Sequence, residues 1–156
     1  MTMTNATTNA TTSPTAAGTT AGTTAAHWTG VDPAGHWLQV ASSLVPALAA
    51  RCAEHDRLGD FVDDGIALAR DHGLVSMLVP SEVGGGGASH AEACAVLDVL
   101  AHGCPSTALS LSMHSHLVAA QVWRHQRGLP APVLAKVADA KVLLISTGAG
   151  LSLIHI

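Results

Sequence analysis

Four side chains of the types that bind zinc lie between positions 102 and 116: His102, Cys104, His114 and His116. Imidazole and thiolate are preferred ligands of Zn²⁺, so their spacing decides whether they could share an ion. His114 and His116 stand two apart on a predicted helix, which turns their side chains about 200° away from each other. The pattern therefore argues against a metal site, and we expect none.

Two other patterns could also carry chemistry. The run Gly84–Gly87 could cradle a phosphate, but no Lys-Ser or Lys-Thr follows it and no clear strand of a βαβ unit precedes it. We therefore predict a flexible turn that leads to a helix cap at Ser89. Ser, His and Asp are abundant, yet no GxSxG elbow or comparable context selects a nucleophile. The sequence gives no support to a hydrolase triad.

The composition limits the classes of partner. Of the 156 residues, 48% are hydrophobic and 12% are charged, about half the usual charged fraction, so many elements must be covered by other protein. Seven Lys and Arg and a net charge of -4 provide no cationic patch for nucleic acid. The longest uncharged internal run, 99–123, is interrupted by Gly, Pro, Ser and His, so we expect no membrane helix.

The compartment is also predicted from the sequence. No Lys or Arg precedes Arg51, so the start lacks the basic region of a secretory signal, and we expect a cytoplasmic protein. The three cysteines, Cys52, Cys94 and Cys104, form no CxxC pair and are predicted to be reduced, mostly buried thiols.

The first half of the chain predicts a leader and two helices. Residues 1–26 are almost entirely Thr, Ala, Asn and Gly and are predicted to form a disordered leader. Asp32-Pro33 is typical of a helix start, and an apolar stripe continues to about residue 55. Pro46 lies inside this stripe, so the helix is kinked there or starts later. Asp63 can cap a second, shorter helix, which Gly73 ends.

The second half predicts three more helices and a strand. After a buried connector at 75–80, Ser89 and Glu92 have the spacing of a capping box, which predicts a buried helix up to residue 102. Ser106 or Thr107 can cap a helix that continues to residue 127, and a fifth helix is predicted at 132–140. The β-branched and aliphatic run 141–146 predicts the first strand of another domain.

The last six residues, 151–156, resemble the translation of a transposase sequencing adaptor. A strand also needs neighbours, and the predicted one is followed by Gly148-Ala149-Gly150 and this tail. We therefore expect a non-native tail at 151–156 and a native chain that continues beyond Gly150.

Two stretches carry a resemblance to a known family. Residues 73–89, GLVSMLVPSEVGGGGAS, resemble the GL..l.vP.e.GG.G.s signature of the acyl-CoA dehydrogenase N-terminal domain. Residues 100–109, followed by Met113-His114, are similar to the lA..c.s.al...mH stretch of the same family. The predicted order of several buried helices before a strand also agrees.

The resemblance implies an all-α, N-terminal helical bundle of the acyl-CoA dehydrogenase type, ending in the first strand of a truncated middle β domain. The expected organisation is a leader at 1–26, the helical domain at 27–140, the start of the middle domain at 141–150 and the tail. It implies an FAD enzyme, an acyl-CoA or related small-molecule substrate, an electron-transfer flavoprotein as partner and, for the full-length protein, a homo-oligomer.

In the dehydrogenase branch, a carboxylate removes the α proton of an acyl thioester while the β hydrogen leaves as hydride to flavin N5. A dry site strengthens the hydrogen bonds that hold the developing enolate. The family's base lies in its C-terminal domain, so the resemblance assigns no catalytic residue to the eleven acids of this chain. The fragment alone is expected to be inactive.

The resemblance also implies binding residues. On the predicted helix from Thr107 to Trp123, four residues would line the acyl end of the substrate cavity: Leu109, Ser112, Met113 and His116. The alternative is that these four are core residues. Cofactor binding is assigned to three residues of the strand: Ile145, Ser146 and Thr147.

The sequence departs from the family pattern at this strand. Many dehydrogenases have a Thr-Glu pair followed by a Gly-Ser turn, whereas residues 146–150 read STGAG. This difference leaves room for flavin-dependent monooxygenases and for sulfur- or nitrogen-oxidising relatives. A non-catalytic helical interaction module is a further alternative.

Overall fold

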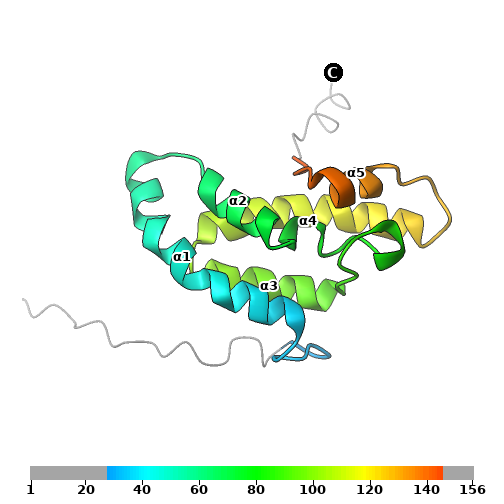
Figure 1. Cartoon of the computed structure of the whole chain (residues 1–156), viewed down its shortest axis with the longest axis horizontal. Helices are drawn as coiled ribbons and strands as arrows, with labels where there is room; N and C mark the ends of the chain where they lie inside the picture. Colours follow the sequence, from blue (N-terminus) through cyan, green and yellow to red (C-terminus); the bar gives the residue numbers. More distant parts are fainter. Residues whose placement is uncertain (1–27, 146–156) are drawn as a thin grey trace, which may run out of the picture.

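The computed structural model describes residues 28–145 (Figure 1). This part contains five α-helices and no strand: α1 (His36–Leu58), α2 (Asp63–Asp71), α3 (His90–Ala101), α4 (Pro105–His125) and α5 (Val133–Ala140). Two 3₁₀ turns, η2 (Leu74–Ser76) and η3 (Ser81–Val83), lie between α2 and α3. The prediction of an all-α domain is confirmed. The leader, Ser146-Thr147 and the tail lie outside the described residues.

The central helix is α3, which packs against α1 on one side and α4 on the other (Figure 1). The α2 and α5 helices contact α4, and the η2 turn contacts all three. The main core gathers fully buried side chains from η2, α3, α4 and α5, among them Leu74, Leu100, Leu111 and Leu134. The α4 helix is thus covered along one side by core, and its remaining surface is available for a site.

The first helix starts later than Asp32-Pro33 predicts. The side chain of Asp32 accepts a hydrogen bond from the Ala34 amide at 2.9 Å, so it caps a local turn, and α1 begins after Gly35. From there α1 runs through Pro46 to Leu58, so the alternative that the helix starts later than its apolar stripe suggests is wrong. A side-chain cap and a turn satisfy the same backbone groups, which is why the sequence signal is ambiguous.

Two other predicted caps are each displaced. Asp63 is the first helical residue of α2, after Val62, and makes no cap. Cys104 is the N-cap of α4, and Pro105 occupies the first helical position, so Ser106 and Thr107 are already inside the helix. A proline is well tolerated there because its missing N–H would have no intrahelical partner.

The start of α3 confirms the capping box. The Ser89 hydroxyl accepts from the Glu92 amide at 3.2 Å, and the Glu92 carboxylate accepts from the Ser89 amide at 2.9 Å. Cys94 of α3 is exposed where it borders a cavity between α3 and α4, whereas Cys104 is buried. The prediction of buried thiols is therefore right for Cys104 and wrong for Cys94.

Removing the Ser89 hydroxyl should weaken this helix. We expect Ser89→Ala to lower the free energy of unfolding by about 1 kcal/mol, since one amide of the first turn loses its acceptor. Urea denaturation followed by circular dichroism measures this. Ser42→Ala, at an exposed position inside α1, serves as the control and should change stability by less than about 0.5 kcal/mol. An equal loss in both variants would contradict the cap.

The glycine run is an ordered loop rather than the flexible turn that we predicted. Four successive amides, those of residues 85–88, donate to carbonyls of the segment before them at 2.8–3.1 Å: Pro80, Ser76, Val79 and Met77. A side chain at Gly85 would overlap Val79, and one at Gly86 would overlap the Trp37 ring. The absence of Cβ atoms therefore lets this loop fold directly onto the connector.

The connector itself is buried as predicted, with Leu74, Val75 and Met77 each at most 2% exposed. Of the predicted strand at 141–146, the described part, 141–145, belongs to neither a helix nor a strand. A strand needs a neighbour for its hydrogen bonds, and residues 28–145 supply none. Among these residues no helix combines the length and hydropathy needed to cross a membrane.

Candidate functional site

A cavity of about 270 Å³ lies between α3 and α4, beside the buried connector. Ser112 and His116 of α4 line it opposite Cys94 and Leu97 of α3, and Leu78 lies at its connector side. No carboxylate lines this cavity in the described part of the chain. It can hold an apolar ligand and offer it hydroxyl, imidazole and thiol groups, but it supplies no carboxylate base.

The four residues assigned to the acyl site fall into two pairs. Ser112 and His116 line the cavity, whereas Leu109 and Met113 do not, and their side chains are 65% and 43% exposed. None of the four is buried, so the alternative that they are core residues is wrong. Leu109 and Met113 are exposed apolar side chains within residues 28–145, as expected for a helix face that meets a ligand or another part of a protein.

The opposite side of α4 explains why the side chains of Leu109, Ser112, Met113 and His116 face away from the core. Leu111, Val118 and Val122 are buried against the core, which turns the 109–116 stripe outward. His114 is buried and His116 is exposed, so the prediction that these two imidazoles point apart is confirmed. No group of three or more potential metal ligands occurs within the described residues.

The sequence analysis missed the role of His114 beyond its place in the Met113-His114 motif. Its Nε2 lies 2.7 Å from the Val75 carbonyl oxygen, and its Nδ1 accepts from the Leu144 amide at 2.9 Å. Burial lowers the pKa of His114, against the opposing effect of the Val75 hydrogen bond. Only that motif could have drawn attention to it, because both partners lie at least 30 residues away.

The predicted cofactor residues follow directly on this contact. Ile145 is 76% exposed, next to the hydrogen-bonded Leu144. Ser146 and Thr147 lie outside the described residues. The backbone directly before Ile145 is thus held against the middle of α4, through His114.

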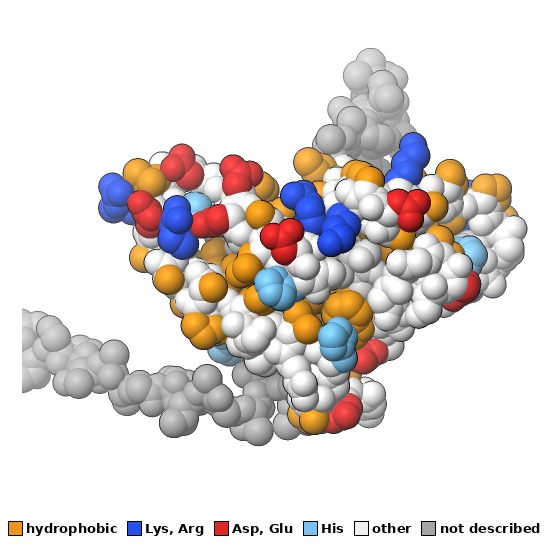
Figure 2. All heavy atoms as spheres, viewed as in Figure 1, with side chains coloured by type: hydrophobic (Ala, Val, Ile, Leu, Met, Phe, Trp, Pro, Cys, Tyr) orange, Lys and Arg blue, Asp and Glu red, His pale blue; other side chains and the backbone are white. Residues whose placement is uncertain are grey.

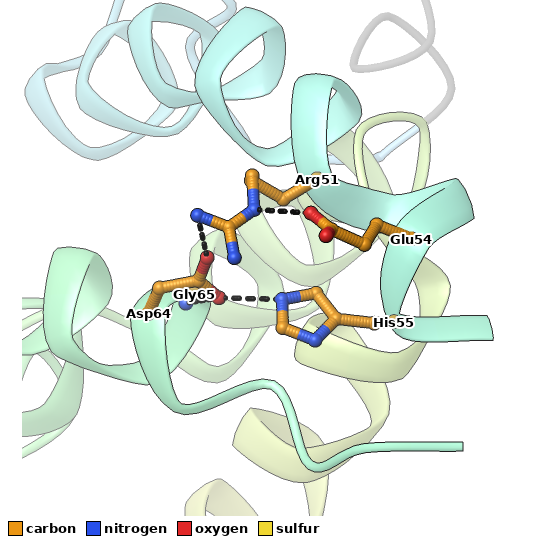
Figure 3. Close-up of polar contacts among 5 residues, drawn as sticks. All are labelled: Arg51, Glu54, His55, Asp64 and Gly65. Carbon is orange, nitrogen blue, oxygen red and sulfur yellow. Dashed lines mark hydrogen bonds and ion pairs between the residues drawn. The ribbon is translucent and has the colours of Figure 1, made fainter. Parts of the chain in front are cut away.

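A polar cluster joins the end of α1 to the start of α2 (Figure 3). Asp64 accepts from His55 at 2.8 Å and from the Gly65 amide at 2.8 Å, and it pairs with Arg51 at 3.5 Å. Arg51 also pairs with Glu54 at 3.2 Å. Partial burial acts to raise the pKa of Asp64, but the hydrogen bonds and the charges of His55 and Arg51 lower it. These contacts fix the α1–α2 corner.

A second hollow, of about 210 Å³, adjoins this cluster and reaches Cys104 at the start of α4. Burial acts to raise the pKa of Cys104, but hydrogen bonds from Thr107, Cys52 and the Ser106 amide lower it. Burial raises the pKa of Cys52, with Cys104 adding to the effect. The hollow contains none of the residues assigned to substrate or cofactor.

Charge is unevenly distributed over the surface. In Figure 2 the Lys and Arg side chains gather over the C-terminal part of α1, over α2 and over α5. The α3 helix carries neither Lys nor Arg. The cavity between α3 and α4 therefore borders an apolar, cation-poor helix, which suits an uncharged ligand group better than an anion.

Comparison with known proteins bears on the whole domain. The family model described as acyl-CoA dehydrogenase, N-terminal domain, matches residues 39–147, which are 109 of the 156 residues. No curated protein matches the chain. The match begins in α1 and ends just beyond the segment that His114 holds, so it includes the cavity, α2 to α5 and all of α1 except its first three residues. The chain belongs to the acyl-CoA dehydrogenase family and carries its N-terminal domain.

Proposed function

We propose that this chain is the helical part of an FAD-dependent, acyl-CoA dehydrogenase-like oxidoreductase that performs α,β-dehydrogenation of an acyl-CoA thioester. The family match over 39–147 carries this proposal. The apolar cavity between α3 and α4 supports it, because it combines apolar walls with the polar groups of Ser112 and His116. Apolar cavities with a few polar groups are the usual form of small-molecule sites.

The role of the chain's own residues would be to bind and to exclude water. The cavity would take the acyl end, where Leu97 and Leu78 contact the hydrocarbon and displace water from it. A dry environment strengthens the hydrogen bonds available to a thioester carbonyl. No acid of the cavity can remove the α proton, so this proposal places the base in another part of the full-length protein.

The described residues fit a flavin at the end of the domain. Ile145 is exposed on a segment that is itself neither helix nor strand, and Met113 is exposed on α4. Exposed apolar side chains of this kind suit the flat, largely apolar isoalloxazine ring. When bound, FAD supplies the hydride acceptor, N5. Ile145, Ser146 and Thr147 are the residues of this chain proposed to hold it.

Filling the cavity tests substrate binding. We expect octanoyl-CoA to bind the 156-residue chain, and Ala119→Phe to weaken binding at least tenfold, because Ala119 lines the cavity and an aromatic ring would occupy it. Calorimetric titration measures the affinity. Ala135→Phe, at an exposed position of α5 away from the cavity, is the matched control and should bind normally. Equal weakening by both variants, or no binding to the parent chain, would contradict the proposed site.

The reaction class is tested by reading the source locus across codon 150. An open frame that encodes a flavin-contacting domain and a later carboxylate base would support the dehydrogenase. A flavin domain without that base would favour the monooxygenase alternative, which the STGAG departure at 146–150 suggests. A stop codon directly after Ile156 would contradict catalysis and favour a helical interaction module.

A further inference from the structure

His114 joins two segments that are far apart in the sequence. It is 1% exposed, in the middle of α4, and its two ring nitrogens contact the Val75 carbonyl at 2.7 Å and the Leu144 amide at 2.9 Å. The side chains around it come from the connector and from α4 and carry no charge: Leu74, Val75, Met77, Leu78, Ser115 and Val118. Both hydrogen-bonding capacities of a neutral imidazole are thus used inside an apolar environment.

The two partners fix the tautomer of the ring. A carbonyl oxygen can only accept, so Nε2 must carry the proton and donate to Val75. An amide N–H can only donate, so Nδ1 must be the unprotonated nitrogen that accepts from Leu144. A protonated ring would place two N–H groups against each other at Leu144. His114 is therefore neutral, with the proton on Nε2.

The contact at Leu144 anchors an otherwise irregular segment. Within 141–145, two side-chain hydrogen bonds hold the backbone: Arg70 Nε donates to the Lys141 carbonyl at 3.2 Å, and the Leu144 amide donates to His114. Leu143 and Leu144 are partly buried against the core, whereas Ile145 is exposed. The last fixed polar contact before the proposed flavin residues is therefore the one made by Nδ1 of His114.

We propose that His114 is a positioning residue, whose Nδ1 lone pair anchors the Leu144 amide and thereby sets where the backbone leaves the helical domain at Ile145. The effect on a flavin rests on the proposed function. The anchoring itself depends only on His114 and Leu144.

Two substitutions separate the two hydrogen bonds of the ring. In His114→Asn, the amide oxygen can occupy the place of Nδ1 and still accept from Leu144, but the donor to Val75 is lost. In His114→Gln, the longer amide can place its NH₂ group near Nε2 and still donate to Val75, but the acceptor for Leu144 is lost. If His114 only filled space in the core, the contact to the Leu144 amide would not be kept in His114→Asn and lost in His114→Gln.

Hydrogen exchange of the Leu144 amide in the 156-residue chain is the readout. We expect the amide to be protected in the parent and in His114→Asn, and to exchange about tenfold faster in His114→Gln. Amides of Leu100 and Leu111, in the core, report whether each variant remains folded. Equal exchange at Leu144 in both folded variants, or the reverse order, would overturn the proposal.

A measurement on the parent chain covers the case in which the variants unfold. Long-range proton–nitrogen spectra of the imidazole should show a protonated Nε2 and an unprotonated Nδ1. A proton on Nδ1 would overturn the proposal without any substitution. Neither measurement requires flavin, so they decide the anchoring independently of octanoyl-CoA binding and of the reading frame, which decide the proposed function.

Discussion

Gly85→Ala is expected to lower the free energy of unfolding by about 3 kcal/mol, the upper end of the usual cost of overpacking. A Cβ at this position would overlap the Cβ and the carbonyl oxygen of Val79 and would lie 2.6 Å from its carbonyl carbon. A backbone carbonyl cannot rotate away, so the loop would have to lift from the connector. That movement would strain the adjoining amide–carbonyl bonds, such as Gly86 to Ser76. Denaturant unfolding followed by circular dichroism gives the value.

The matched control is Gly59→Ala. Gly59 has a φ of +68° and no neighbouring atom within 4 Å of the added Cβ, so this variant carries backbone strain without overlap. We expect it to cost about 1 kcal/mol. If Gly85→Ala costs no more than Gly59→Ala, steric overlap is not what selects glycine in this loop.

Local signals in the sequence were sufficient where both partners are close neighbours. Ser89 and Glu92 are three residues apart, so their reciprocal hydrogen bonds could be predicted, and Gly73 has the left-handed φ of +80° expected from its place after a helix. Where one side chain can satisfy backbone groups in two ways, the predicted helix start differs from the observed one by a few residues. Asp32 can cap a helix or a turn, and only the structure shows that it forms the turn.

Contacts between distant segments could not be predicted from the sequence. The glycine run looked like a flexible turn because its partners, the connector carbonyls, are not recognisable as such from residue types. Cys94 was expected to be buried because apolar residues surround the axis of its helix, but it borders the cavity between α3 and α4 and is exposed. His114 has partners 39 and 30 residues away, and no short pattern encodes them.

For the candidate site, too, features within one helix could be predicted and contacts between two helices could not. The i, i+3, i+4, i+7 spacing placed Leu109, Ser112, Met113 and His116 on one side of α4, and that side is indeed not buried. Spacing alone could not show that Ser112 and His116 line a cavity with α3 while Leu109 and Met113 do not. That distinction depends on the distance between two helices, which the sequence of one of them does not contain.

Acidification should destabilise the protein through His114. Its pKa lies below the ordinary value of 6.5 because burial disfavours the charged ring, so below about pH 6.5 the unfolded chain binds a proton that the folded chain does not. No Asp, Glu, Lys or Arg lines the small space beside the ring in the described part of the chain, although α2, α3 and α5, which all contact α4, carry such residues. Stability should therefore be full above pH 7 and fall by up to about 1.4 kcal/mol per pH unit below 6.5.

A second acid-induced loss of stability is expected at a lower pH. The lowered pKa of Asp64 means that its contribution is present above its ordinary value of 3.8 and is lost as the pH falls below about 4. The two losses can be told apart by denaturant unfolding at intervals from about pH 7.5 down to about pH 2, because the Asp64 contribution is lost only below its ordinary pKa. Asp64→Asn should remove only the lower step, and His114→Gln only the upper one.

The matched control for the upper step is His116→Gln, the same substitution at the exposed histidine two residues further along α4. Its stability between pH 7.5 and 4.5 should follow that of the parent. Because Nδ1 can accept from Leu144 only while the ring of His114 is neutral, exchange of the Leu144 amide should accelerate over the same pH interval as stability is lost. A pH slope that persists in His114→Gln would show that another group is responsible and that His114 does not couple protonation to this contact.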